Sequence, residues 1–259
     1  MITQTIKQIH HDLCALGIKK GDTLLIHASY KSLGPIEGGA KTFFDAVLSY
    51  LGKDGTLVMP ALSFTTVTEE NPYFDVKETP SCVGYLTEYF RTSVDGVVRS
   101  LHATHSCCAK GRLAGELTAD HEKDDTPVGK NSPFYKLLRY DGKILFLGCT
   151  TNHNTLMHGV QEAADLPYLF DREHPVEYIL KDANGNTIRR PSYRHYFVVD
   201  GKRLRSRYSL LEPLLNDEDL TRGKLLQANC TLLSARAAWD KALAEMTRDP
   251  WAFVIGFVE

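Results

Sequence analysis

The spacing of apolar residues over the first 60 positions predicts two helices and two strands in alternation. Apolar residues recur at helical intervals over residues 5–16 and again over residues 40–51. Two short apolar runs, at 23–27 and 55–59, are bounded by turn residues, as buried strands are. A strand, a crossover helix and a second strand in this order favour a parallel, right-handed unit.

The second half of the chain shows one clear strand and then a change of pattern. Residues 143–148 form an apolar run that leads through a polar loop into a predicted helix at 154–164. Beyond this helix, apolar segments at 176–180 and 187–199 flank Asn184-Gly185, a dipeptide typical of hairpin turns. This part of the chain is therefore expected to be antiparallel.

These elements indicate one α/β domain. No repeat, low-complexity tract or linker divides the chain, so a single domain over 1–259 is the simplest interpretation. We expect a mixed, largely parallel central sheet flanked by helices, with an antiparallel β-hairpin insertion at 170–200 in the C-terminal third. A helical pattern at 234–245 predicts a surface helix near the end of the chain.

Composition and charge exclude several classes of protein. The 259 residues are 43% hydrophobic and carry a net charge of -2, so no overall basic field attracts nucleic acid. The N-terminus lacks the features of a signal peptide, and no apolar stretch is long enough to cross a bilayer. The six cysteines form no C-x-x-C pair and are expected to be reduced thiols. We therefore expect a cytoplasmic protein with a small-molecule substrate and with no nucleic-acid or membrane partner.

The loop after the first strand has a composition that suits a phosphate-bearing ligand. Residues 27–34 carry two serines and a lysine and end in a glycine, and a helix begins shortly afterwards. Ligands of open α/β sheets bind outside the carboxyl ends of the strands, where this loop is expected. Neither a Walker A sequence nor G-x-G-x-x-G is present, which disfavours a nucleoside triphosphate or a dinucleotide. An ordinary turn between a strand and a helix remains an equal alternative.

Histidines concentrate at two places in the middle of the chain. Residues 99–106 hold two histidines and three hydroxyl side chains with little helical or strand pattern. His158 and Glu162 lie four residues apart on the predicted helix and therefore on one face of it. A carboxylate that holds an imidazole fixes its tautomer and raises its basicity, as a general base requires. A solvated ion pair with the same spacing is the alternative.

Taken together, these segments resemble the aminoglycoside 3-N-acetyltransferase family, also called the antibiotic N-acetyltransferases. Each matching piece is short, but the set occurs in the order of the family and near its spacing, from about residue 16 to residue 168. The pieces are residues 21–29 with 32–34 and 38–40, 55–60, 99–102 with 104–106, 126–127 with 129 and 132–133, 142–145, and 154, 155, 158, 162, 167 and 168.

The resemblance implies direct transfer of an acetyl group from acetyl-CoA to an amine, without an acyl-enzyme. No metal is expected to take part, because the spacing of zinc ligands is missing and a His–Glu base is adequate for the chemistry. Acetyl-CoA would bind mainly within 20–110, and the catalytic helix would lie near 154–164. His158 would be the general base, Glu162 its partner and Thr155 a donor to the oxyanion. The residues implied in acetyl-CoA binding are His27, Ser29, Tyr30, Lys31, Ser32, Leu33, Gly34, Leu101, Thr104 and Ser106.

The acceptor implied by the resemblance is the 3-amino group of an aminoglycoside, and the enzyme would be a monomer or a homodimer. An aminoglycoside is polycationic and needs carboxylates, which Asp165, Asp171 and Glu173 would supply just beyond the catalytic helix. Residues 159–161 depart from the usual family sequence and border the acceptor pocket. Another amine is therefore the alternative acceptor within the same family.

Two other classes of function stay open. A non-catalytic CoA-binding module would keep the loop at 27–34 but could dispense with His158 and Glu162. A zinc-dependent hydrolase is disfavoured because the chain has neither H-E-x-x-H nor C-x-x-C. Its candidate ligands would be His102, His105, Cys107, Cys108, His153 and His158.

Overall fold

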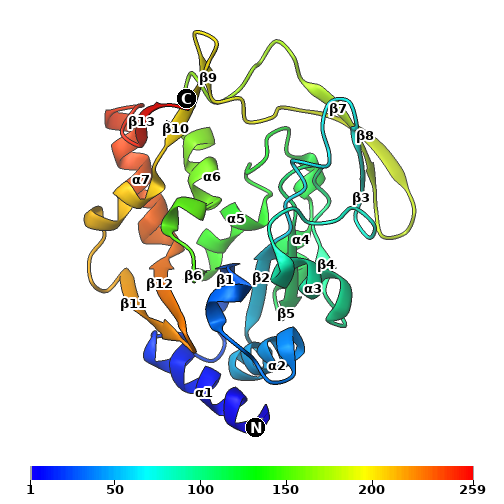
Figure 1. Cartoon of the computed structure of the whole chain (residues 1–259). Coiled ribbons are helices and arrows are strands. Elements are labelled where there is room, and N and C mark those ends of the chain that lie inside the picture. Colours follow the sequence, from blue (N-terminus) through cyan, green and yellow to red (C-terminus); the bar gives the residue numbers. More distant parts are fainter. Residues whose placement is uncertain (1, 259) are drawn as a thin grey trace.

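The computed structural model describes residues 2–258 and centres on a seven-stranded mixed sheet (Figure 1). The strand order across this sheet is β11-β12-β6-β1-β2-β5-β4. The mixed α/β class predicted from the sequence is confirmed. The strands are β1 (Thr23–Ala28), β2 (Thr56–Pro60), β4 (Val98–Arg99), β5 (Cys107–Gly111), β6 (Lys143–Leu147), β11 (Leu220–Leu225) and β12 (Ala228–Ser234).

The three central strands are parallel and buried on both faces. β1 pairs with β2 on one side and with β6 on the other, in parallel in both cases. All of β2 is buried, as are all but the last residue of β1 and all but the first residue of β6. Continuous apolar runs of this kind are typical of strands covered by helices. The carboxyl ends of the three strands therefore meet at one edge, as the sequence predicts.

The outer strands of the sheet are antiparallel. β5 pairs with β2 and β4 pairs with β5 on one side, and β12 pairs with β6 and β11 with β12 on the other. The parallel part of the sheet is thus its middle. The local pattern of apolar residues does not indicate that these outer strands are antiparallel, because pairing direction depends on where the chain returns to the sheet.

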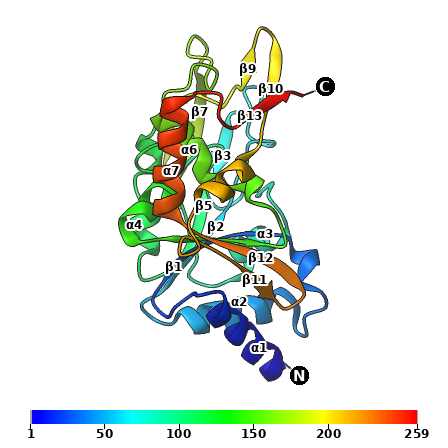
Figure 2. The same cartoon turned by 90° about the vertical axis from the view of Figure 1, so that its left-hand side faces the viewer.

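Helices cover both faces of the sheet, as Figure 2 shows. One core lies between the sheet and α1, α2 and α3, where Phe44 stacks on Phe90. The other lies beneath α4, α5, α6 and α7 and includes Met157 and Trp239. No helix among residues 2–258 combines the length and apolarity that a bilayer span requires. The helices are α1 (Ile2–Ala15), α2 (Gly39–Leu51), α3 (Tyr85–Ser93), α4 (Ala114–Thr118), α5 (Pro133–Lys136), α6 (Leu156–Ala163) and α7 (Ala235–Arg248).

Short 3-10 segments link these elements. η1, η4 and η5 follow β1, β6 and β10 (Lys202–Ser206), and each contributes residues to one cavity at the carboxyl edge of the parallel strands. The segments are η1 (Tyr30–Leu33), η2 (His121–Lys123), η3 (Leu137–Tyr140), η4 (Thr151–His153) and η5 (Tyr208–Leu214).

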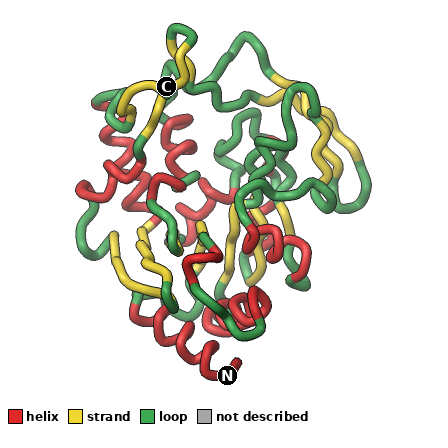
Figure 3. The backbone as a smooth tube through the Cα atoms, viewed as in Figure 1, coloured by secondary structure: helices red, strands yellow, loops and turns green. Residues whose placement is uncertain are grey.

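Two small three-stranded sheets lie beyond the central sheet, and Figure 3 shows the long loops that lead to them. The predicted hairpin is β7–β8, with Asn184-Gly185 in its turn. Its second strand ends at Ser192, earlier than predicted, because the chain then leaves for the other small sheet. The strands are β3 (Tyr73–Asp75), β7 (Val176–Lys181) and β8 (Thr187–Ser192) in one sheet, and β9 (Val198–Val199), β10 (Lys202–Ser206) and β13 (Val254–Phe257) in the other.

Gly148, directly after β6, lies against the loop that follows β1. Its φ is +64°, and its N–H donates to the carbonyl of Asn229 at 2.8 Å. A Cβ at this position would overlap the hydroxyl of Ser32, which itself donates to the carbonyl of Ser29 at 2.6 Å. Both the backbone conformation and the close approach of the two loops therefore require glycine.

We expect Gly148→Ala to lower the free energy of unfolding by about 2–5 kcal/mol, the sum of the left-handed strain and the overlap. Gly185→Ala is the matched control, because Gly185 also has a positive φ, +89°, but nothing lies within 4 Å of its added Cβ. The control should lose only about 1–2 kcal/mol. Urea unfolding of both variants measures the difference, and equal losses would show that the two loops are not in close contact.

Candidate active site

A cavity of about 850 Å³ opens at the carboxyl edge of the parallel strands. Its wall includes the last residues of β1 and β2, the loop after β1, parts of segment 62–87, the loop between β6 and α6, His158 of α6 and Tyr208 of η5. A volume of this size holds a small-molecule ligand. Among the described residues that line it, none is an Asp or a Glu, and Lys31 is the one Lys or Arg.

The loop after β1 is divided between the cavity and the protein interior. Ser32 donates to the backbone of its own loop, Leu33 is buried in the core, and Gly34 lies against the side chain of Gln227. These three residues, which were predicted to bind acetyl-CoA, do not line the cavity. Four of the predicted residues do line it: His27, Ser29, Tyr30 and Lys31.

The other three residues predicted for acetyl-CoA hold the loop between β4 and β5 in place. The hydroxyl of Ser106 accepts from Arg99 Nε at 2.9 Å, and Leu101 packs against the small core beneath β3 and β7. The hydroxyl of Thr104 lies 2.9 Å from His105 Nδ1. None of the three lines the cavity, so the structure gives them a supporting position rather than a place in its wall.

The hydrogen-bond partners of His158 favour one position for its ring hydrogen. Nδ1 lies 3.1 Å from Oε1 of Gln161 and 3.2 Å from the hydroxyl of Tyr208, which itself donates to the same Oε1 at 3.0 Å. With the Gln161 amide assigned so that its Oε1 faces the ring, Nδ1 is the nitrogen that donates, because an amide oxygen only accepts. In this arrangement the lone pair of His158 is on Nε2. The residue lies in the first turn of α6 and lines the cavity.

The spacing on the helix suggested that Glu162 contacts His158. In the structure it does not. Its Oε1 accepts from the N–H of Val128 at 2.8 Å and lies 2.9 Å from Nε2 of His195. The predicted pairing is corrected because Gln161, one residue nearer, takes the place beside His158. The side chains of Glu162 and His195 are 8% and 6% exposed, so this hydrogen-bonded pair is buried.

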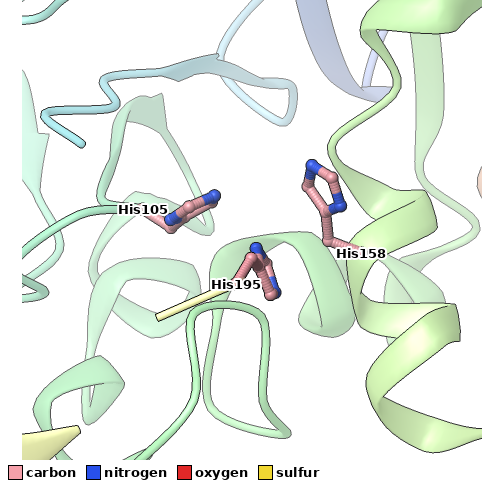
Figure 4. A group of neighbouring side chains, drawn as sticks. All are labelled: His105, His158 and His195. Carbon is pink, nitrogen blue, oxygen red and sulfur yellow. The ribbon is translucent and has the colours of Figure 1, made fainter. Parts of the chain in front are cut away.

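Three histidines from distant segments point toward one another, as Figure 4 shows. One ring nitrogen from each of His105, His158 and His195 lies within 4.8 Å of the other two. His105 is held by a tight turn in which Nδ1 of His102 accepts from the N–H groups of Thr104 and His105, at 3.2 and 3.0 Å. His195 lies in the segment after β8, and its backbone forms an isolated antiparallel β-bridge with Phe170.

Burial keeps these rings neutral near physiological pH. Desolvation lowers the pKa of His158 to about 4, and the hydrogen bond to Gln161 opposes this shift only in part. Desolvation, and then the neighbouring rings, lower the pKa of His105 and of His195 well below the usual range. Desolvation likewise raises the pKa of Glu162 to about 8. The rings thus offer lone pairs rather than charges.

His27 presents another neutral imidazole to the cavity. Its ring stacks on Phe146, with centroids 5.2 Å apart, and its Nε2 is buried without a hydrogen-bond partner among the described residues. Burial, followed by the nearby rings of His153 and His158, lowers its pKa to about 3. This orphaned polar atom would be satisfied by a ligand in the cavity.

The residues named as candidate zinc ligands from the sequence do not form one cluster. Cys107 and Cys108 are buried in the two cores on opposite faces of the sheet. The ring of His102 stacks on that of His121, 4.5 Å away. His153 is exposed at the cavity wall. Of that set, His105 and His158 alone are in the histidine trio.

Comparisons with known proteins identify the family. The sequence profile of the aminoglycoside 3-N-acetyltransferase family matches residues 25–247. The chain belongs to this family. Aminoglycoside N(3)-acetyltransferase III of Salmonella sp is 35% identical over 178 residues, which are 63% of this chain and 62% of that relative. The SPbeta prophage-derived aminoglycoside N(3')-acetyltransferase-like protein YokD of Bacillus subtilis (strain 168) is 27% identical over 270 residues, covering 92% of this chain and 91% of that protein.

Solved structures of family members share the fold. The apoenzyme of aminoglycoside acetyltransferase AAC(3)-IVa superposes with a TM-score of 0.78 and 26% identity, covering 96% of this chain and 90% of that one. A histidine-to-alanine mutant of the same enzyme, in complex with a gentamicin, gives the same TM-score and identity and covers 95% of this chain and 90% of that one. AAC-IIIb in a binary complex with CoASH has a TM-score of 0.78 and 24% identity, covering 94% of this chain and 96% of that one.

In this family member, the acidic residues predicted to bind the acceptor lie outside the cavity. Asp165 pairs with Arg172 at 2.7 Å, and Asp171 pairs with His174 at 2.9 Å, both near the surface. Glu173 is exposed. The prediction rested on their closeness to α6 in sequence, but α6 ends at residue 163 and the chain then runs along the surface.

Three residues of the site escaped the sequence analysis. Gln161 and Tyr208 orient His158, and His195 binds Glu162. The sequence spacing could have indicated Gln161, because it lies three residues after His158 on the same helical face. The other two are on segments that reach the site only through the tertiary fold.

The buried carboxyl group of Glu162 should make stability depend on pH. Its folded-state pKa of about 8 exceeds the unfolded value of about 4.3, so between these values the folded state binds a proton that the unfolded state does not. The contribution of Glu162 to the free energy of unfolding should therefore fall as pH rises from about 5 to about 8, against the gain that the buried neutral histidines contribute as pH rises toward their unfolded pKa of about 6.5.

In Glu162→Gln, which cannot titrate, that contribution is lost, so the free energy of unfolding should rise more with pH than it does in the wild type. Glu177→Gln is the control, because Glu177 is an exposed partner of Arg189 and should leave the pH dependence unchanged. Urea unfolding across this pH range measures the slopes. A wild-type slope that Glu162→Gln leaves intact would contradict the raised pKa.

Proposed function

We propose that this chain transfers the acetyl group of acetyl-CoA directly to an amine, with His158 as the general base. The observation that carries the proposal is the orientation of His158, whose Nδ1–H is bound to Gln161 while Nε2 is free in the cavity wall. An alkyl ammonium cannot attack a thioester until a base removes a proton. A neutral imidazole with its lone pair toward a ligand cavity supplies that base.

The donor would enter along the loop after β1. Ser29, Tyr30 and Lys31 line the cavity there, and Lys31 supplies its one ammonium or guanidinium group for the phosphates of acetyl-CoA. A solved family member with this fold is a binary complex with CoASH, which supports the same co-substrate here. Ser32, Leu33 and Gly34 would act by shaping this loop rather than by touching the donor.

The oxyanion that forms when the amine attacks needs a hydrogen-bond donor. Thr155 precedes His158 by one turn and lines the cavity, and its hydroxyl makes no hydrogen bond within the described part of the chain. It is our first candidate for that donor. His27 is available as well, because its orphaned Nε2 belongs to a ring that stays neutral.

The first candidate acceptor is an aminoglycoside, by analogy with relatives that carry this name and with a mutant solved in complex with a gentamicin. A second candidate is an amine with a single positive charge. It is favoured by the absence of any Asp or Glu among the described residues that line the cavity, since a polycation needs several carboxylates.

Purified protein should release CoA thiol from acetyl-CoA when a suitable amine is added. We expect a panel of aminoglycosides and of monoamino sugars to contain at least one acceptor, with the acetyl group on a primary amine by mass spectrometry. A preference for aminoglycosides supports the first candidate, and a preference for monoamines the second. If the protein binds acetyl-CoA but no amine stimulates thiol release, the proposed reaction is wrong.

His158→Ala should lower kcat by about 10²–10⁴, the usual contribution of a general base, and should leave acetyl-CoA affinity nearly unchanged. His11→Ala is the control, because His11 is an exposed histidine on α1, 75% accessible. Because the pKa of His158 is lowered to about 4, its neutral form persists as pH falls, and kcat should stay constant down to about pH 5 and drop below it. A near-normal kcat in His158→Ala would remove the residue from the mechanism.

A further inference from the structure

We propose that His105, His158 and His195 together bind one divalent transition-metal ion such as Zn²⁺, and that the bound ion inhibits the transferase. One nitrogen from each ring already lies within 4.8 Å of the other two (Figure 4). Zinc binds imidazole nitrogen at about 2.0–2.1 Å, so small rotations of the side chains bring the three nitrogens around one ion.

The second nitrogen of each ring is already engaged, which fixes the direction of the first. Nδ1 of His158 bonds to Gln161, Nδ1 of His105 lies 2.9 Å from the Thr104 hydroxyl, and Nε2 of His195 lies 2.9 Å from Glu162. These bonds leave Nε2 of His105, Nε2 of His158 and Nδ1 of His195 free. A hydrogen-bonded second nitrogen on every ligand is the outer shell found at protein metal sites.

The state of Glu162 gives a separate reason to place a cation here. Its Oε2 is buried without a hydrogen-bond partner among the described residues, and the contacts of its carboxyl group include no Lys or Arg. A buried carboxylate in this position is costly unless a positive charge lies close by. An ion on Nδ1 of His195 would provide that charge through the imidazole, as a carboxylate–histidine–metal arrangement does.

The chemistry of the ligands selects the kind of metal. Three neutral imidazoles suit zinc, copper, nickel or iron(II), whereas magnesium and calcium require oxygen ligands. The fourth coordination position would open toward the cavity, since His158 is part of the cavity wall. Three histidines with an open position form a geometry that zinc adopts readily.

Metal binding and base catalysis exclude each other at His158. Nε2 has one lone pair, and a lone pair bound to zinc cannot take a proton from the acceptor amine. The ion should therefore compete with the acceptor. This inhibition rests on the proposed role of His158, whereas the binding of the ion does not.

Direct binding is tested with metal-free protein, titrated with ZnCl₂ in a calorimeter and with CoCl₂ in an absorption spectrometer. We expect one ion per chain and the intense visible absorption of four-coordinate cobalt. His105→Asn and His195→Gln should each remove the cobalt signal, and Glu162→Gln should weaken zinc binding about 10–100-fold. His11→Asn should bind as the wild type does.

Unchanged zinc affinity in both His105→Asn and His195→Gln, or no binding by the wild type, would overturn the site. Circular dichroism of each variant shows whether it is folded, so a loss of binding is attributed to the ligand and not to unfolding.

Inhibition is tested by thiol release from acetyl-CoA with and without zinc. Zinc should raise the apparent KM for the acceptor in the wild type, a chelator should restore activity, and His105→Asn should keep its own residual activity in the presence of zinc. Zinc that binds without inhibiting would refute the inhibitory step. Absence of any transferase activity would refute the proposed function instead, and the calorimetric and cobalt results would still decide the site.

Discussion

The hydrogen bond from His158 Nδ1 to Oε1 of Gln161 is the interaction on which the rest of the site depends. It assigns the hydrogen to one side of the ring and leaves the lone pair of Nε2 toward the cavity. Tyr208 bonds to the same amide oxygen and closes this network from η5. Burial then keeps the ring neutral, with its pKa lowered to about 4. An amide and a phenol thus hold the imidazole in the form that the proposed acetyl transfer requires.

The fold supplies these groups from segments that are far apart in sequence. The parallel strands β1, β2 and β6 end at one edge, from which the loop after β1 and the segment leading to α6 both start. The loop before β5 delivers His105, the segment after β8 delivers His195, and η5 delivers Tyr208. The insertion beyond the central sheet is therefore part of the site, since its last segment buries Glu162 and completes the trio of histidines.

The frame of the protein was more predictable than its contacts. Strands β1, β2 and β6, helix α6 and the hairpin turn follow from local periodicity and turn residues, and each was predicted within a few positions. The partner of Glu162 was not predicted correctly, because the four-residue spacing between Glu162 and His158 is compatible with several contacts. Gln161 lies on the same face, and the actual partners, Val128 and His195, are brought near only by tertiary packing. The antiparallel direction of the outer strands was not predicted for the same reason.

The most direct test of this account is nitrogen NMR of the protein labelled in its histidine side chains, recorded from pH 8 down to about pH 5. We predict that His158, assigned by its absence in His158→Ala, stays neutral over the whole range with its hydrogen on Nδ1. Its Nε2 should then show the chemical shift of an unprotonated nitrogen. A ring that titrates near its unperturbed pKa of about 6.5, or that carries its hydrogen on Nε2, would contradict the account.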